Sequence, residues 1–109
     1  MDAIREYFNR GGQSPFAAWF NRLNREAAAK ITTALVRMQQ GNFSNAKGVG
    51  AGVYEYRVDF GPGYRIYLGK DGEELVILVG GGSKKRQQED IEMAQTRWQD
   101  YRQRKIVEG

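Results

Sequence analysis

The sequence predicts an α+β fold, in which an antiparallel sheet of about four strands carries helices on one face. Two observations lead to this prediction. Apolar and polar residues alternate with period two on both sides of Gly61-Pro62-Gly63, which is typical of a β-hairpin with one buried face. Residues 75–79 are apolar throughout, as expected of a central strand buried on both faces.

The chain begins with a short strand followed by a helix. Residues 3–8 predict the strand, and Gly11-Gly12 ends it. Ser14-Pro15 indicates an N-cap followed by proline at the first helical position. From Phe16 to Leu23, apolar residues recur at i, i+3, i+4 and i+7, which predicts an amphipathic helix.

A second helix is predicted over residues 27–38, ended by Gly41-Asn42, so that the two form an N-terminal helical hairpin. Residues 24–26 fit either a tight turn between two helices or a bend in one. Residues 41–52 form a glycine-rich loop that holds Lys47.

After the hairpin of residues 53–68, Asp71-Gly72 predicts a second tight turn into the central strand. The glycine-rich and basic residues 80–86 then lead to a C-terminal helix. Its apolar stripe is formed by Ile91, Ala94, Trp98 and Tyr101.

Composition limits the kinds of chemistry. The 109 residues suit one domain without repeats, and neither Cys nor His occurs, so thiol chemistry and most zinc sites are excluded. The net charge of +4 and a pI near 9.5 favour an anionic partner, either nucleic acid or an acidic protein. The sequence holds no membrane-spanning run and starts without a signal-peptide pattern, so we expect a cytoplasmic protein without a membrane partner.

The polar face of the hairpin is the first candidate site. Even positions are apolar in both strands, so odd positions share the outward face, which is expected to stay open. Arg57 and Arg65 then lie directly or diagonally opposite each other, an arrangement that weakens a sheet by up to about 1 kcal/mol. A phosphate-binding site would explain such a pair. Glu55 and Tyr67 share the same face.

Several motifs are spread along nearly the whole chain. They are Ser14-Pro15-Phe16 with Trp19-Phe20 and Leu23, Gly41-Asn42-Phe43, Gly52-Val53-Tyr54-Glu55-Tyr56-Arg57, Gly61-Pro62-Gly63-Tyr64-Arg65-Ile66-Tyr67, and Gly81-Gly82-Ser83-Lys84 with Gln87 or Gln88, Asp90-Ile91 and Ala94. In combination they resemble the RelE/ParE superfamily of toxins from bacterial toxin–antitoxin modules, and within it the HigB-type addiction module killer proteins.

The resemblance implies a single RelE-like toxin domain over residues 1–109, which acts without metal or cofactor as an endoribonuclease on mRNA at the ribosome. It also implies silencing by a cognate helix-turn-helix antitoxin. Carried over by position, the catalytic residues are Arg57, Arg65 and Lys84, with Lys47 contacting RNA. One departure is Ser83, where the group usually has an acidic residue before the lysine.

The chemistry suits cations. RNA is cut when its own 2′-hydroxyl attacks the adjacent phosphorus, and the fork of a guanidinium matches two phosphate oxygens. We expect Arg65 to stabilise the transition state, with a surface ion pair to Asp59 or Glu55 as the structural alternative. Lys84 is expected to transfer a proton, because neighbouring positive charges make its ammonium group release a proton more readily. Its alternative is a solvated basic run before a helix.

The remaining candidates are secondary. Glu55 is either a general base or, as we favour, an ion-pair partner of Arg57. Tyr67 stacks on a base or donates a proton if it is an exposed strand residue. Lys85 and Arg86 extend the basic surface toward RNA. Aromatic residues at helical spacing are expected in the core, namely Trp19, Phe20 and Trp98.

Two other functions stay open. One is a ParE-like toxin of the same fold, which inhibits DNA gyrase by binding and cuts nothing. The other is a non-catalytic RNA-binding module. The outward arginines together with Lys84 favour the nuclease, because a toxin that only binds does not need that constellation.

Overall fold

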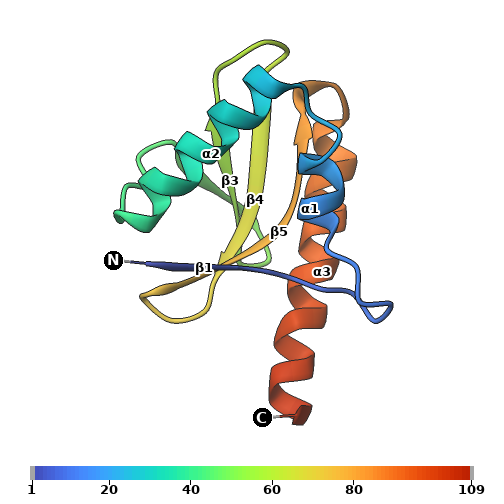
Figure 1. Ribbon diagram of the computed structural model, residues 1–109. Helices are drawn as coiled ribbons and strands as arrows, with labels where there is room; N and C mark the ends of the chain where they lie inside the picture. The colour runs from blue at the N-terminus through green and yellow to red at the C-terminus, as the bar shows by residue number, and fades with distance from the viewer. Residues whose placement is uncertain (1, 109) are drawn as a thin grey trace.

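A computed structural model describes residues 2–108 of the chain. Its elements are, in chain order, β1 (Ala3–Glu6), α1 (Pro15–Phe20), α2 (Arg25–Gln39), β2 (Ala46–Gly50), β3 (Val53–Val58), β4 (Tyr64–Lys70), β5 (Leu75–Ser83), a 3₁₀ turn (Lys84–Arg86) and α3 (Gln87–Glu108). Figure 1 shows the sheet at the centre, with the turn between β3 and β4 at one end and β1 at the other. No helix within residues 2–108 is long and apolar enough to cross a membrane.

The sheet is mixed, with five strands in the described residues and the order β1-β5-β4-β3-β2. The expected antiparallel sheet of about four strands is therefore corrected in two ways. β1 pairs with β5 in parallel, and the region predicted as a glycine-rich loop contains β2. Strand β2 is hidden in the sequence because glycines interrupt it. Pairing of Lys47 with Glu55 on β3 holds it in the sheet.

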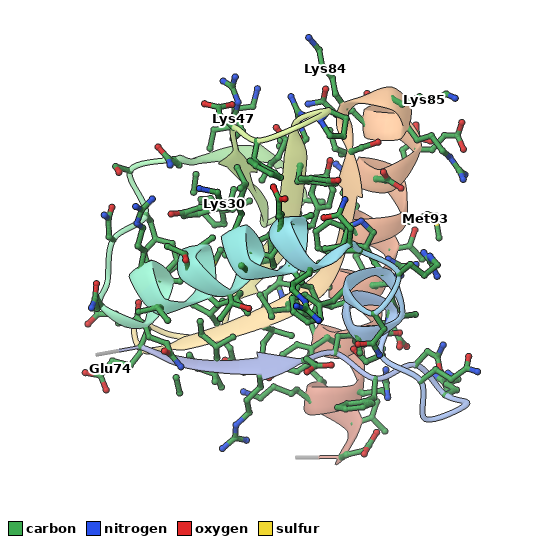
Figure 2. All side chains as sticks on the ribbon, turned by 45° about the horizontal axis from the view of Figure 1, so that its top comes forward. Lys30, Lys47, Glu74, Lys84, Lys85 and Met93 are labelled. Carbon is green, nitrogen blue, oxygen red and sulfur yellow. The ribbon has the colours of Figure 1, made fainter. Side chains whose placement is uncertain are left out.

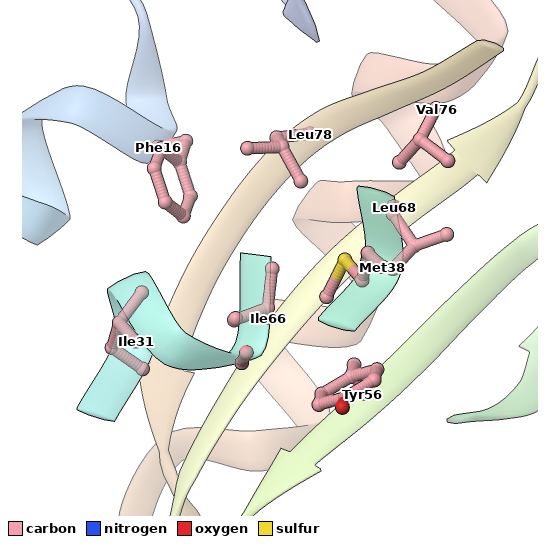
Figure 3. Packing of buried hydrophobic residues seen from close by; sticks show 9 residues of the cluster. Phe16, Ile31, Met38, Tyr56, Ile66, Leu68, Val76 and Leu78 are labelled. Carbon is pink, nitrogen blue, oxygen red and sulfur yellow. The ribbon is translucent and has the colours of Figure 1, made fainter. Parts of the chain in front are cut away.

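One face of the sheet packs against α1 and α2, as predicted. Figure 3 shows this core, in which α2 contributes Ile31 and Met38 and the sheet contributes Tyr56, Ile66 and Leu68. These sheet residues are the even positions that the alternation assigned to the buried side. The hydrophobic pattern thus set the orientation of the hairpin correctly.

The second face is not open, which corrects the prediction of helices on one face only. Helix α3 runs across it (Figure 1), and Trp98 and Ala94 pack there against Val53, Tyr67 and Val79. The apolar run of β5 already required cover on both faces, because every second side chain of a strand points to the opposite side.

Capping side chains set the starts of the N-terminal helices. Ser14 Oγ accepts from the Ala17 amide at 3.0 Å, and Asn24 Oδ1 accepts from the Ala27 amide at 2.8 Å. Asn24 therefore begins a separate helix, which resolves the open question of a turn or a bend. The expected helical hairpin is not clearly formed, since α1 lies against β5 and α2 runs diagonally across the sheet (Figure 1).

The glycines of residues 80–82 belong to β5 and permit close packing on both faces. A Cβ on Gly81 would lie 2.2 Å from the Trp19 ring, and one on Gly82 would lie 2.1 Å from an Asp90 carboxylate oxygen. Strand β5 therefore extends beyond the predicted residues 75–79. Its neighbours leave no room for a side chain at Gly81 or Gly82.

Candidate functional site

The outward residues of β2, β3 and β4 form two neighbouring rows. Lys47 pairs with Glu55, which in turn pairs with Tyr67. In the next outward row, Arg57 lies directly opposite Arg65. The two arginines therefore face each other as the sequence predicted, although their side chains differ strongly in exposure.

Glu55 is the centre of the first row and is fully buried, with 0% of its surface exposed. The Tyr67 hydroxyl donates to its Oε2 at 3.1 Å, and the Gln87 amide donates to the same oxygen at 2.9 Å. Oε1 lies 3.9 Å from Lys47 Nζ and 3.8 Å from Arg65 Nε. The favoured ion pair between Glu55 and Arg57 is therefore wrong.

Full burial also removes Glu55 from the list of groups that can touch a substrate. A buried carboxylate requires nearby positive charge and hydrogen-bond donors, and here two cations and two donors supply them. Its role in this structure is to hold Lys47 and Arg65 at one end of the sheet. We call the cluster of Lys47, Glu55, Arg65, Tyr67 and Gln87 the Glu55 cluster.

Arg65 pairs with Glu55, one of the two partners named in the structural alternative, and not with Asp59. The pair is buried rather than on the surface, since Arg65 is only 7% exposed. Besides facing Glu55, it donates from Nη1 to the Gly63 carbonyl at 3.2 Å. Within residues 2–108, Arg65 Nε and Glu55 Oε1 are buried atoms without a hydrogen-bond partner, and they face each other across their ion pair. The guanidinium is thus held from two sides.

Arg57 belongs to the solvent-exposed rim. Its side chain is 54% exposed and lies 3.9 Å from Asp59 Oδ1, whose side chain is 88% exposed. Lys47 is similarly accessible at 60%. Arg57 and Lys47 can therefore meet an external anion, whereas Arg65 presents little surface.

Lys84 joins this end of the molecule through the turn between β3 and β4. Its backbone amide donates to the Gly63 carbonyl at 2.9 Å, the same oxygen that Arg65 contacts. The Lys84 side chain is exposed, and Figure 2 shows it and Lys47 projecting from the same end of the molecule. Arg65 and Lys84 are therefore brought together around Gly63.

Lys85 and Arg86 are exposed and extend the basic surface at the start of α3. Figure 2 places Lys85 beyond Lys84, away from Lys47. Arg86 is turned to its own helix, where Nη2 lies 2.7 Å from Glu89 Oε2. These two residues therefore lie outside the Glu55 cluster, at its margin.

Tyr67 is 0% exposed, so the expectation of an exposed tyrosine that stacks on a base is wrong. Burial, together with the neighbouring Glu55 charge, raises its pKa, which keeps the hydroxyl protonated as a donor. Sequence reasoning assigned Gln87 no role at all. Its position at the start of α3 was the signal that could have found it. A helix that begins beside the sheet can direct its first polar side chain toward the sheet residues.

Aromatic residues of the helices are structural, as predicted for Trp98, which is buried and stacks on Tyr101. Tyr101 donates to Asp71 Oδ2 at 2.6 Å, in the turn that lies at the opposite end of β4 from Gly63. Burial, followed by this hydrogen bond, raises the pKa of Tyr101 to about 12. Among residues 2–108, no three acidic side chains come together in a way that could hold a metal ion.

The chain is similar to known proteins over most of its length. The family model described as Phage derived protein Gp49-like (DUF891) matches residues 18–99, which include β2 to β5, both arginines and Lys84. An uncharacterized protein of Haemophilus influenzae is 43% identical over 80 residues, which cover 72% of this chain and 81% of the relative. The chain therefore belongs to the Gp49-like family, which consists of phage-derived toxins of the RelE/HigB type. Membership of a toxin family implies that an antitoxin is its partner.

Proposed function

We propose that this protein is the HigB-like toxin of a type II toxin–antitoxin module, and that it cleaves mRNA on the ribosome as a metal-independent endoribonuclease in the cytoplasm. The observation that carries the proposal is the gathering of Lys47, Arg57, Arg65 and Lys84 at one end of the sheet. A buried carboxylate fixes two of these cations, so they are in place before any substrate arrives.

In the proposed reaction the 2′-oxygen of the substrate loses its proton and bonds to the adjacent phosphorus, and the bond from phosphorus to the 5′-oxygen breaks. The 5′-oxygen takes up a proton, leaving a 2′,3′-cyclic phosphate and a 5′-hydroxyl. Arg65 stabilises the charge on the phosphoryl oxygens through the 9% of its side chain that is exposed, and Arg57 positions the phosphate. Lys84 transfers a proton, since it is the exposed amine beside Gly63.

Lys47 contacts the RNA backbone from the rim, and Lys85 and Arg86 add charge farther out. Tyr67 acts only through Glu55, because it is buried. The proposed partner that silences the toxin is a small helix-turn-helix antitoxin whose acidic or extended segment covers the exposed cations.

The test is primer extension on a reporter mRNA in a reconstituted translation system, with and without ribosomes. We expect new 5′ ends within codons that require ribosomes, and loss of about 10²–10³ in rate for Arg65→Ala. Lys84→Ala should lose cleavage as well while leaving the fold intact, because the side chain is exposed. Arg102→Ala, an exposed change on α3, serves as the control.

Intact mRNA in the presence of folded protein that still stops growth would exclude the nuclease. Inhibition of gyrase supercoiling would then identify the ParE-like alternative. RNA binding without any cleavage or growth arrest would identify the non-catalytic module.

A further inference from the structure

Two neighbouring hollows lie at the edge of the sheet formed by β2. One, of about 250 Å³, is lined by Lys47, Arg57 and Asp59 among others. The second, of about 270 Å³, lies between α2 and β3 and includes Lys30, Arg37, Arg57 and Asp59. Because Arg57 and Asp59 line both, the two hollows are direct neighbours.

The second hollow exists because β2 is short. Its pairing with β3 begins at Ala46 opposite Tyr56, so Arg57 and Val58 of β3 pair only with β4, and no strand lies on their other side in the described structure. Helix α2 borders this gap. Lys30, Thr33 and Arg37 follow the i, i+3, i+7 spacing of one helix flank, and all three are exposed.

Positive charge in this hollow is largely uncompensated. Lys30 and Arg37 have no carboxylate within ion-pairing distance among residues 2–108, and Arg57 has only the highly exposed Asp59 at 3.9 Å. Arg37 gains from its place in the last turn of α2, where the helix dipole favours a cation. Lys30 Nζ lies 5.5 Å from the centre of the Phe60 ring. Figure 2 shows Lys30 directed toward the sheet from α2.

We propose that the hollow between α2 and β3 binds the backbone of single-stranded RNA that continues from the Glu55 cluster past Arg57. Lys30 and Arg37 contact phosphates, and Phe60 offers an aromatic face for a base. Single-stranded RNA suits the path because its unstacked bases can reach such a ring. Asp59 opposes the binding, because its carboxylate lies 3.9 Å from Arg57 and repels a phosphate there. The proposal rests on the proposed function and adds the course of the substrate strand.

The experiment measures binding of a fluorescent 2′-O-methyl RNA oligonucleotide, which has no free 2′-hydroxyl and so reports binding without cleavage. The variant Lys30→Gln/Arg37→Gln should bind about tenfold more weakly, and its salt dependence, log K against log salt, should flatten by about 1.4 for two lost phosphate contacts. The control Arg5→Gln/Arg102→Gln removes the same charge at exposed positions away from the hollow and should bind like the wild type. Asp59→Asn should bind more tightly than the wild type.

Three results would overturn the inference: no binding by the wild type, equal binding by the wild type and the Lys30/Arg37 variant, or an equal loss in the control. Loss of binding to an acidic peptide with unchanged RNA binding would instead assign the hollow to a protein partner and also overturn it. The proposed function is judged separately by ribosomal cleavage with the wild type. Cleavage without a contribution of the hollow to binding refutes only the inference, and hollow-dependent binding without cleavage refutes only the nuclease.

Discussion

Arg65 Nε and Glu55 Oε1 face each other across 3.8 Å, both buried and both without a hydrogen-bond partner in the described structure. Glu55 also lies at the centre of the contacts with Lys47, Tyr67 and Gln87. This single carboxylate therefore lies against two of the four cations of the proposed site, Lys47 and Arg65.

Glu55→Gln should lower the free energy of unfolding by about 3 kcal/mol, because it leaves the buried Arg65 without its opposite charge. The double variant Glu55→Gln/Arg65→Gln should lose less than the sum of the single losses, with a coupling of about 0.5–3 kcal/mol. Urea titration of the four proteins in this cycle measures both quantities. Additive losses would show that the two charges do not interact.

Arg57→Gln should change the free energy of unfolding by less than about 1 kcal/mol, since its ion pair with Asp59 is exposed. Arg65→Gln, at the directly opposite position, should destabilise more because that side chain is buried. Thermal unfolding of the two variants makes the comparison. A larger loss in Arg57→Gln would contradict the assignment of Arg57 to the rim.

Gly63→Ala should impair cleavage beyond its effect on stability. Gly63 has φ of +80°, where a side chain costs roughly 1–2 kcal/mol, and an added Cβ would lie 3.2 Å from Arg65 Nη1. Gly72→Ala is the matched control, with φ of +76° and no atom within 4 Å of the added Cβ. Both variants should lose similar stability, and only Gly63→Ala should cleave more slowly. Equal activities of the two would argue against a role for this contact.

Gly81→Ala should destabilise the fold by about 1–3 kcal/mol, because the new Cβ would overlap the Trp19 ring at 2.2 Å. Gly48→Ala in β2 provides a strand glycine whose added Cβ meets nothing within 4 Å. Calorimetric midpoints should fall for the first variant and stay near the wild type for the second. A similar fall in both would mean that loss of glycine in a strand, and not Trp19, is responsible.

Above pH 10 the stability should decline, in part through Tyr101. Its pKa is raised from 10.0 to about 12 in the folded state, so the folded protein favours the protonated hydroxyl. The stabilisation is complete below pH 10 and is lost as the pH rises from about 10 to about 12. Denaturation at a series of pH values should show a shallower decline for Tyr101→Phe, which lacks this proton. Parallel curves would exclude a contribution from Tyr101.

Local patterns in the sequence predicted much of the fold. The period-two alternation fixed the hairpin, its buried face and the opposition of Arg57 and Arg65. Ser14-Pro15 located the start of α1, and the apolar run of residues 75–79 located the centre of β5. These signals depend on neighbours along the chain, which is why they can be read without the structure.

Long-range packing decided the rest. Burial of Glu55 and Tyr67 under α3 follows from how Trp98 approaches Gly52 and Gly69, two glycines distant from it in sequence. The parallel pairing of β1 with β5 joins opposite parts of the chain, and no local pattern reports it. The sequence by itself therefore determined the helices, the β3–β4 hairpin and the centre of β5, and it named the positive residues of the proposed site, but it missed β2. Tertiary structure alone decided which of those residues are buried and which are exposed, because exposure depends on what packs above each side chain.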